Sequence, residues 1–166
     1  MDKIEIENLI RELIEKTTIP VREIVIESDG SPLGAGANNM WVSVEVNQPH
    51  YFIGRDGEAL SALNHLVRRI IETKMPIDAE NPEGATSTVM VDINGFQKKR
   101  IENIHAVAHM MAERARYFKS NIEVDPMSAF ERRVVHEFLS TETDLKTEST
   151  GEGRDRRVVI KYIGTI

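Results

Sequence analysis

The spacing of hydrophobic residues along this chain predicts an alternation of helices and strands. Apolar residues that recur every three or four positions indicate amphipathic helices, whereas short runs rich in β-branched residues indicate strands. On this basis we expect helices over residues 3–16, 58–73, 95–119 and 129–140. We expect strands over residues 21–27, 40–46, 88–93, 121–124, 145–150 and 156–163. The pattern therefore predicts an α+β protein.

Turn-forming residues predict how these elements connect. Glycine and proline gather in residues 28–39 and 75–87, which we expect to be loops, and residues 49–53 are expected to be short and irregular. The first two strands should pair as a hairpin. The last two strands should form another hairpin across Gly151-Glu152-Gly153.

The longest predicted helix should link two domains. Its apolar residues are spaced alternately three and four apart and form one stripe: Ile101, Ile104, Ala108, Met111, Ala115 and Phe118. We expect a first domain over residues 1–93, and a second part over residues 94–166 that holds the linking helix and a small β-α-β-β unit. The helix of that unit should begin after Ser128, which with Glu131 has the spacing of a capping box.

Length and composition limit the class of protein. A chain of 166 residues suits one domain or two small ones. It contains no cysteine, which excludes disulfides, cysteine-ligated metals and a thiol nucleophile. No apolar run approaches the roughly 20 residues that span a bilayer, and the acidic N-terminus is unlike a signal peptide. We therefore expect a cytoplasmic protein, and no residue pattern requires a cofactor.

Charge is distributed unevenly along the chain. The net charge is −6, which disfavours a protein that coats nucleic acid by bulk attraction. Residues 1–93 hold 8 basic and 16 acidic residues, whereas residues 94–166 hold 13 and 11. Any anion should therefore bind at a local site.

The first candidate site is the glycine loop Gly54-Arg55-Asp56-Gly57, which opens a predicted helix. Two glycines let a phosphate backbone approach the main chain, and the N-terminus of the following helix favours an anion. Arg55 adds a positive charge, which Asp56 offsets. A plain helix-entry turn is the alternative interpretation.

The second candidate site lies on the predicted helix after Ser128. Arg132 and His136 are four residues apart and should share one face of that helix. An arginine and a histidine at this spacing can hold adjacent phosphates, or one phosphate and one base. Phe130, Val134 and Phe138 should take the opposite, buried side, and a solvated helix face is the alternative interpretation.

These two segments carry a family resemblance. The order of strand, short helical turn, glycine loop, helix and strand resembles the core of a KH domain, with loop and helix reading IGRDGEALSALNHLV. The preceding helix and strand resemble the type II arrangement of that domain. The words MSAFERRVVH and DRRVVI are similar to an R-3-H domain, named for an arginine and a histidine separated by three residues. In this order they resemble the bacterial Jag family (SpoIIIJ-associated proteins) over essentially the whole chain. Many members carry a further N-terminal domain and a more basic glycine loop.

The resemblance implies single-stranded RNA, or single-stranded DNA, as the partner. The residues it implicates in binding are Gly54, Arg55, Asp56, Gly57, Arg132, Arg133, His136, Arg156 and Arg157. It also implies a bacterial post-transcriptional regulator with links to cell elongation, cell shape and cell-wall synthesis. A small stand-alone KH protein or a second copy of the chain is the protein partner it implies. The competing hypothesis is a KH-like interaction scaffold that has lost nucleic-acid binding, which the acidic balance and Asp56 favour.

Other candidate residues are better explained by structure. His105 and His109 have the spacing of paired metal ligands but lack a third, so a solvated or packed pair is favoured. Trp41 and Phe52 should be core residues rather than base-stacking platforms. Gly34-Ala35-Gly36 should be a hairpin turn, because a strand and not a helix follows it.

For basic residues outside the two candidate sites, sequence pattern alone does not decide between binding and plain surface. Lys98-Lys99-Arg100 suits a solvated helix face, with a nucleic-acid path as the alternative, and Arg154, Arg156 and Arg157 suit phosphate contact or plain surface equally. The chain has no nucleophile elbow, no metal-ligand constellation and no phosphate-binding lysine loop. We therefore expect a protein that is not an enzyme.

Overall fold

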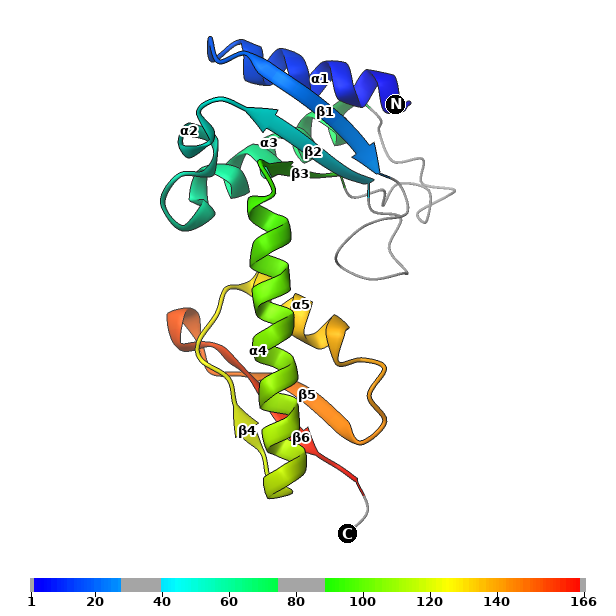
Figure 1. Ribbon diagram of the computed structural model, residues 1–166, viewed down its shortest axis with the longest axis vertical. Coiled ribbons are helices and arrows are strands. Elements are labelled where there is room, and N and C mark those ends of the chain that lie inside the picture. Colours follow the sequence, from blue (N-terminus) through cyan, green and yellow to red (C-terminus); the bar gives the residue numbers. More distant parts are fainter. Residues whose placement is uncertain (1, 28–39, 75–88, 165–166) are drawn as a thin grey trace. The chain divides into compact units, whose positions relative to one another are not determined.

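The computed structural model describes residues 2–27, 40–74 and 89–164, and these form two compact units (Figure 1). Unit 1 extends to Lys98, and unit 2 runs from Lys99 towards the C-terminus. The predicted loops over residues 28–39 and 75–87, including Gly34-Ala35-Gly36, lie outside the described residues. That residues 1–93 and 94–166 are separate domains, each able to fold alone, stays a prediction.

Unit 1 contains three helices that pack with a three-stranded sheet. Its elements in chain order are α1 (Lys3–Glu15), β1 (Val21–Glu27), β2 (Met40–Val46), α2 (Pro49–Ile53), the 3-10 turn η1 (Arg55–Gly57), α3 (Glu58–Lys74) and β3 (Val89–Ile93). The strand order is β1-β2-β3, with β1 antiparallel and β3 parallel to β2, which confirms the predicted pairing of the first two strands.

The short segment α2 corrects one prediction. Residues 49–53 are helical rather than irregular. Pro49 occupies the first helical turn, where its missing N–H is not needed and its fixed φ already suits a helix. Pro49 therefore begins a helix in a segment that was expected to be irregular.

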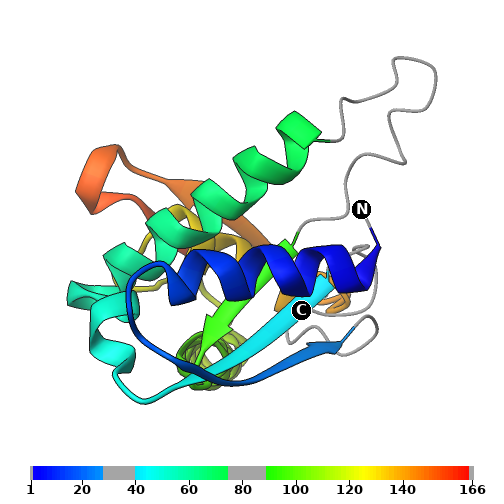
Figure 2. The ribbon, with the colours of Figure 1, turned by 90° about the horizontal axis from the view of Figure 1, so that it is seen from above.

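The core of unit 1 lies between the sheet and two helices. Figure 2 shows α1 and α3 lying across the same face of the strands. The buried residues of this core are Ile6, Ile10, Ile14, Val42, Val44, Val46, Phe52, Leu60, Val67, Val89, Val91 and Ile93. The helical periodicity of α1 and the alternation of β2 thus meet in one apolar layer.

Two polar side chains complete the junction between β3 and the next helix, α4 (Phe96–Phe118). Asn94 has φ +49° and exchanges two hydrogen bonds with the backbone of Val46, at 3.0 and 3.1 Å. The buried carboxylate of Asp92 accepts from the N–H groups of Gln97 (2.8 Å) and Lys98 (3.3 Å) at the first turn of α4. Burial raises the pKa of Asp92, and these N–H groups oppose the rise.

Unit 2 contains most of α4 and a second three-stranded sheet. Its further elements are β4 (Ile122–Glu123), α5 (Ala129–Phe138), β5 (Leu145–Thr150), the 3-10 turn η2 (Gly153–Asp155) and β6 (Arg157–Tyr162). The strand order is β4-β6-β5 and both pairs are antiparallel, as expected for the C-terminal hairpin. The predicted capping box is confirmed, because Ser128 and Glu131 exchange side-chain and backbone hydrogen bonds.

Small residues of α4 form its contact with the core of unit 2. Ala108, Ala112 and Ala115 are buried with residues of α5, β5 and β6. The predicted apolar stripe differs from the structure at two positions. Phe118, its last member, is 59% exposed, and Ala112, which the prediction omitted, is buried. A straight helix turns about 100° per residue, so a spacing of alternate threes and fours rotates steadily away from the core.

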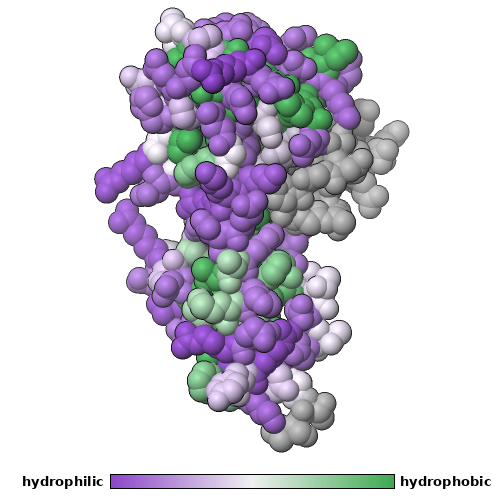
Figure 3. Space-filling view, viewed as in Figure 1, coloured by the Kyte–Doolittle hydropathy of each residue, from purple (hydrophilic) through white to green (hydrophobic). Residues whose placement is uncertain are grey.

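Surface hydrophobic residues elsewhere form small separate patches on a largely hydrophilic face (Figure 3).

Candidate functional site

The glycine loop before α3 requires both of its glycines for backbone reasons. Gly54 has φ +70°, and a Cβ there would stand 2.7 Å from the Cβ of Ala59. Gly57 is buried with φ +84°, and Asp56 between them has φ +53°, a conformation that Asp tolerates better than most residues. The loop therefore turns sharply and carries Arg55 and Asp56 at its tip.

The tip of the loop is almost fully exposed. The side chains of Arg55 and Asp56 are 92% and 89% exposed, and Arg55 Nε lies 4.0 Å from Asp56 Oδ2. An ion pair in such contact with water contributes little energy, so the guanidinium is available to an anion. A phosphate at the tip would meet one cation and one carboxylate, which limits the attraction.

The loop is held from the preceding helix. Phe52 is buried in the core of unit 1, and the N–H of Gly54 donates to the carbonyl of His50 at 3.0 Å. His50 and Tyr51 are exposed, and their ring centroids lie 4.2 Å apart. The helix α2 thus anchors the loop with one aromatic residue and presents two others to solvent.

In unit 2, hydrogen bonds connect residues of α5 and β5 with Met127, which precedes α5, and with Arg156, which directly precedes β6. Arg132 donates to the carbonyl of Met127 (2.7 Å), and Met127 donates its N–H to the carbonyl of Arg156 (3.2 Å). The guanidinium of Arg156 donates to the hydroxyl of Ser149 on β5 at 3.3 Å.

His136 on α5 contacts the same strand, β5. Its Nδ1 lies 2.7 Å from the hydroxyl of Thr147, two residues before Ser149 and on the same face of β5. We name the group formed by Arg132, His136, Thr147, Ser149 and Arg156 the arginine–histidine face. It contains both predicted residues of α5, Arg132 and His136, and one predicted arginine of the hairpin, Arg156.

The electrostatics of this face favour a neutral imidazole. Partial burial lowers the pKa of His136, and the nearby Arg132 guanidinium lowers it further. Thr147 occupies Nδ1, which leaves Nε2 as the ring nitrogen for a ligand. When the Thr147 hydroxyl donates to Nδ1, Nε2 carries the hydrogen and can donate to a phosphate or base oxygen without a net charge.

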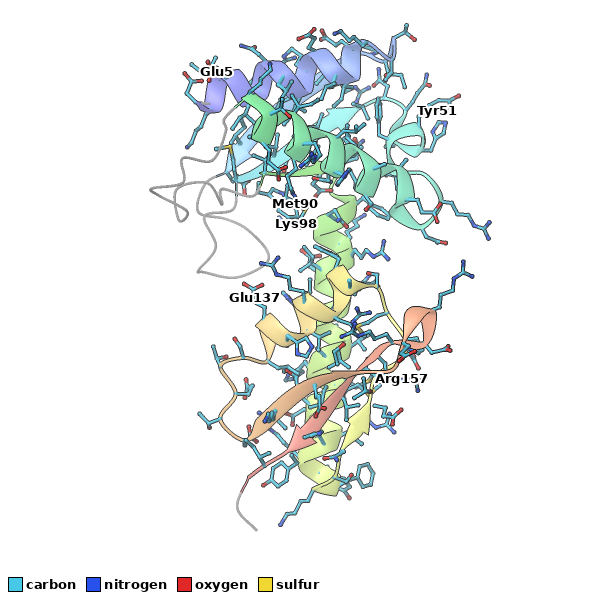
Figure 4. The ribbon with its side chains drawn as sticks, turned by 180° about the vertical axis from the view of Figure 1, so that it is seen from behind. Glu5, Tyr51, Met90, Lys98, Glu137 and Arg157 are labelled. Carbon is cyan, nitrogen blue, oxygen red and sulfur yellow. The ribbon has the colours of Figure 1, made fainter. Side chains whose placement is uncertain are left out.

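The remaining predicted arginines divide between two surfaces. Arg133 is exposed on α5. Arg157, labelled in Figure 4, lies on the opposite face of the sheet from Ser149 and pairs with Glu123 at 3.0 Å. Neighbours in the sequence, Arg156 and Arg157, are therefore separated by the alternation of strand side chains.

The start of α5 is fixed by a separate ion pair. Arg100 on α4 contacts Glu131 at 2.9 Å. Burial opposes the charge of Glu131, but hydrogen bonds from Ser128 and Arg100 outweigh it and lower the pKa. Arg100 therefore positions the helix that carries Arg132 and His136, and this accounts for one member of the basic run Lys98-Lys99-Arg100.

Other candidates from the sequence take structural places. Trp41 and Phe52 are buried, which confirms them as core residues. His105 stacks on Phe138 with ring centroids 4.4 Å apart, and burial lowers its pKa. Within the described ranges, no group of three side chains is placed to hold a metal ion.

Two residues of the arginine–histidine face, Thr147 and Ser149, carry no sequence signal of a site. Only the register of β5 against β6 and the packing of α5 place them beside His136 and Arg156. Phe130 and Phe138 are half-buried rather than fully buried, while Val135, which the four-residue spacing did not select, is buried beside Val134.

Comparison with known proteins independently supports the predicted R-3-H domain in unit 2. Residues 102–162 match the R-3-H domain family. The chain is 31% identical over 112 residues to RNA-binding protein KhpB of Bacillus subtilis (strain 168), covering 66% of this chain and 50% of that protein. It is 25% identical over 121 residues to RNA-binding protein KhpB of Clostridium symbiosum, covering 73% of this chain and 51% of that protein.

A third relative extends the match. The chain is 23% identical over 155 residues to RNA-binding protein KhpB of Lactiplantibacillus plantarum, covering 93% of this chain and 45% of that protein. The chain thus spans about half the length of the curated relatives it matches. Among the described residues, no helix has both the length and the apolar character needed to cross a bilayer.

Proposed function

This chain belongs to the Jag family of bacterial proteins, and from that premise we propose that it binds single-stranded RNA through two sites without catalysing a reaction. The relatives are named RNA-binding proteins, which supports a nucleic-acid partner. The observation that carries the proposal is the arginine–histidine face, where two guanidinium groups and an imidazole converge on one surface of unit 2.

At this face the RNA backbone is the expected ligand. Arginine guanidinium groups form forked hydrogen bonds with phosphate oxygens, and the Nε2 of His136 can donate to a neighbouring oxygen. The hydroxyls of Thr147 and Ser149 hold His136 and Arg156 in place, which reduces the entropy lost on binding. Arg133 adds charge nearby on α5, whereas the ion pair with Glu123 reduces the contribution of Arg157.

For unit 1 we propose a type II KH domain. Its helix, two strands, short helix, glycine loop, helix and strand follow the order expected for that domain. The loop would hold the sugar–phosphate backbone at Gly54, Arg55, Asp56 and Gly57, with bases on the surface beside it. Because Asp56 offsets Arg55, this site alone is expected to be weak.

Two weak sites on one chain suit a regulator that recognises an extended strand. Each would bind with modest affinity, and a strand that reaches both would gain avidity. We accordingly propose a role in post-transcriptional regulation in the bacterial cytoplasm, with the family's link to cell elongation and cell shape as its setting. A small KH protein or a second copy of the chain is the protein partner in this proposal.

A protein-interaction scaffold is the second candidate function. One observation favours it: the exposed carboxylate of Asp56 at the tip of the glycine loop, in a chain of net charge −6. Like charge at that position would repel a phosphate backbone.

A salt titration separates the two functions. The affinity of the full chain for a labelled mixed-sequence single-stranded RNA is measured over a range of salt concentrations. RNA binding through phosphates gives a log–log slope of about −0.7 for each phosphate neutralised. Absence of binding at low salt would contradict the RNA proposal and leave the scaffold. Single-stranded DNA and double-stranded RNA of equal length serve as comparison ligands.

A further inference from the structure

We infer that Tyr51, supported by His50, is a stacking platform for one nucleobase of the RNA held at the glycine loop. This inference rests on the proposed function, because the loop must hold the backbone for a base to reach the platform. It adds to that function a site that contacts a base rather than a phosphate.

The first reason is the exposure of Tyr51. Three tyrosine or phenylalanine side chains among the described residues are more than half exposed: Tyr51 (64%), Tyr117 (83%) and Phe118 (59%). Only Tyr51 lies in unit 1, and Figure 4 shows its ring projecting from α2 away from the rest of that unit. Trp41 and Phe52, which the sequence predicted as core residues rather than platforms, are both buried and cannot stack on a ligand.

The second reason is the connection of Tyr51 to the glycine loop. The bond from the N–H of Gly54 to the carbonyl of His50 sets the loop one helical turn from this aromatic pair. Phe52 fixes the same short helix in the core. The ring therefore has little freedom in its backbone position, which reduces the entropy cost of stacking.

The third reason is the arrangement of the two rings. His50 and Tyr51 lie with centroids 4.2 Å apart and planes inclined at 38°, so His50 shields one part of the tyrosine ring. Single-stranded nucleic-acid sites combine a charged groove for the backbone with aromatic rings for successive bases. Arg55 supplies charge at the loop tip, and Tyr51 supplies a ring beside the loop.

The test compares three variants of the full chain on two probes. Tyr51→Ala removes the ring, Tyr51→Phe keeps it without the hydroxyl, and Tyr117→Ala removes an even more exposed aromatic residue from unit 2. The probes are a mixed-sequence single-stranded RNA and an abasic strand with the same number of phosphates. Each affinity is measured at several salt concentrations.

We expect Tyr51→Ala to weaken RNA binding about tenfold, within the range for the loss of one stacked base. Tyr51→Phe and Tyr117→Ala should stay within about twofold of the original affinity. The salt slope should not change, because stacking neutralises no phosphate. The abasic strand should bind the original chain and Tyr51→Ala equally.

Three results would overturn the inference. RNA affinity that is unchanged in Tyr51→Ala means that the ring contacts no base. An equal loss on the abasic strand means that Tyr51 acts through the loop backbone, and a similar loss in Tyr117→Ala means that any exposed ring contributes. If the original chain binds no RNA at low salt, the proposed function fails and takes this inference with it, a result distinct from the other three.

Discussion

The side-chain amide of Asn64 on α3 pairs with the backbone of Val91 on β3, as a neighbouring strand would. Its Oδ1 accepts from the Val91 N–H at 2.7 Å, and its Nδ2 donates to the Val91 carbonyl at 2.9 Å. A further bond from Nδ2 to the carbonyl of Leu60 holds the amide in place. Because β3 lies at the edge of its sheet, Asn64 satisfies buried backbone groups that none of the described strands reaches.

We expect Asn64→Ala to destabilise unit 1 by about 2–4 kcal/mol, since it leaves the buried N–H and carbonyl of Val91 without partners. Urea unfolding followed by the fluorescence of Trp41 measures this, because Trp41 is the only tryptophan and is buried in unit 1. Asn64→Asp should be worse than Asn64→Ala, as a carboxylate would face two carbonyl oxygens. A loss below about 0.5 kcal/mol in Asn64→Ala would show that water replaces the amide.

Charge changes in the glycine loop test its role in RNA binding. Arg55→Asp should lower RNA affinity tenfold or more, on the order of 1.4 kcal/mol, and make the salt slope shallower by about 0.7. Asp56→Asn should raise affinity, and asparagine tolerates the φ of +53° at this position. Both changes are made in a chain that carries Arg132→Ala and His136→Ala, so that the second site does not mask the effect. Unchanged affinity in both directions would remove the loop from the RNA site.

Alanine substitutions in unit 2 test the arginine–histidine face. Arg132→Ala and His136→Ala should each weaken RNA binding about tenfold, the scale of a lost charge-assisted hydrogen bond. Each side chain also makes one hydrogen bond within the protein, to Met127 or Thr147, so stability should fall by only about 1 kcal/mol. Binding is measured by fluorescence anisotropy and folding by circular dichroism. Arg132→Lys keeps the charge but loses the forked hydrogen bonds, so its RNA affinity should lie between those of the original chain and Arg132→Ala. If a variant unfolds while its folded fraction binds normally, that residue is structural.

The pH dependence of stability follows from two partly buried histidines. Burial lowers the pKa values of His105 and His136 in the folded chain, while both approach about 6.5 in the unfolded chain. Between those values the unfolded state binds more protons. The free energy of unfolding of unit 2 should therefore be level above pH 6.5 and fall as the pH drops below it.

Circular dichroism melts of the full chain from pH 8 to pH 5 measure this fall, and Trp41 fluorescence follows unit 1 separately. His105→Phe keeps the ring stacked on Phe138 without a titrating group, so it should reduce the pH dependence. His109→Phe, an exposed position on the same helix, is the matched control. Equal pH dependence in all three proteins would contradict the assignment. For RNA affinity, protonation of His136 should strengthen binding only below pH 6.5, because its pKa is lowered.

The elements that the sequence predicted well are those with local signals. The helix α5 begins at Ala129 because Ser128 and Glu131 form a capping box within one turn. The strands β1 and β2 follow the β-branched runs, and their ends match the structure. In each case the signal lies in residues close together in the chain, although the pairing partners of the strands, such as Val21 and Val46, are far apart in it.

Features that depend on distant contacts could not be predicted. Asn64 and Asn94 satisfy backbone groups through their side chains, and their partners in β3 and β2 lie 27 and 48 residues away. No periodicity marks a polar residue of this kind. The candidate site shows the same limit: spacing placed Arg132 and His136 on one face, but only strand register adds Thr147 and separates Arg156 from Arg157.

Because strand β4 has only two residues, the two edges of the sheet in unit 2 differ in how easily they open. It contributes residue pairs only at Ile122 and Glu123, whereas β5 and β6 pair along six residues. Local opening requires less free energy where fewer backbone bonds and contacts are broken. Amide protons on the β4 edge should therefore exchange with solvent through brief openings that leave β5 and β6 joined. The contacts of His136 with Thr147 and of Arg156 with Ser149 lie on the β5 side, so this part of the arginine–histidine face keeps its geometry while the β4 edge opens.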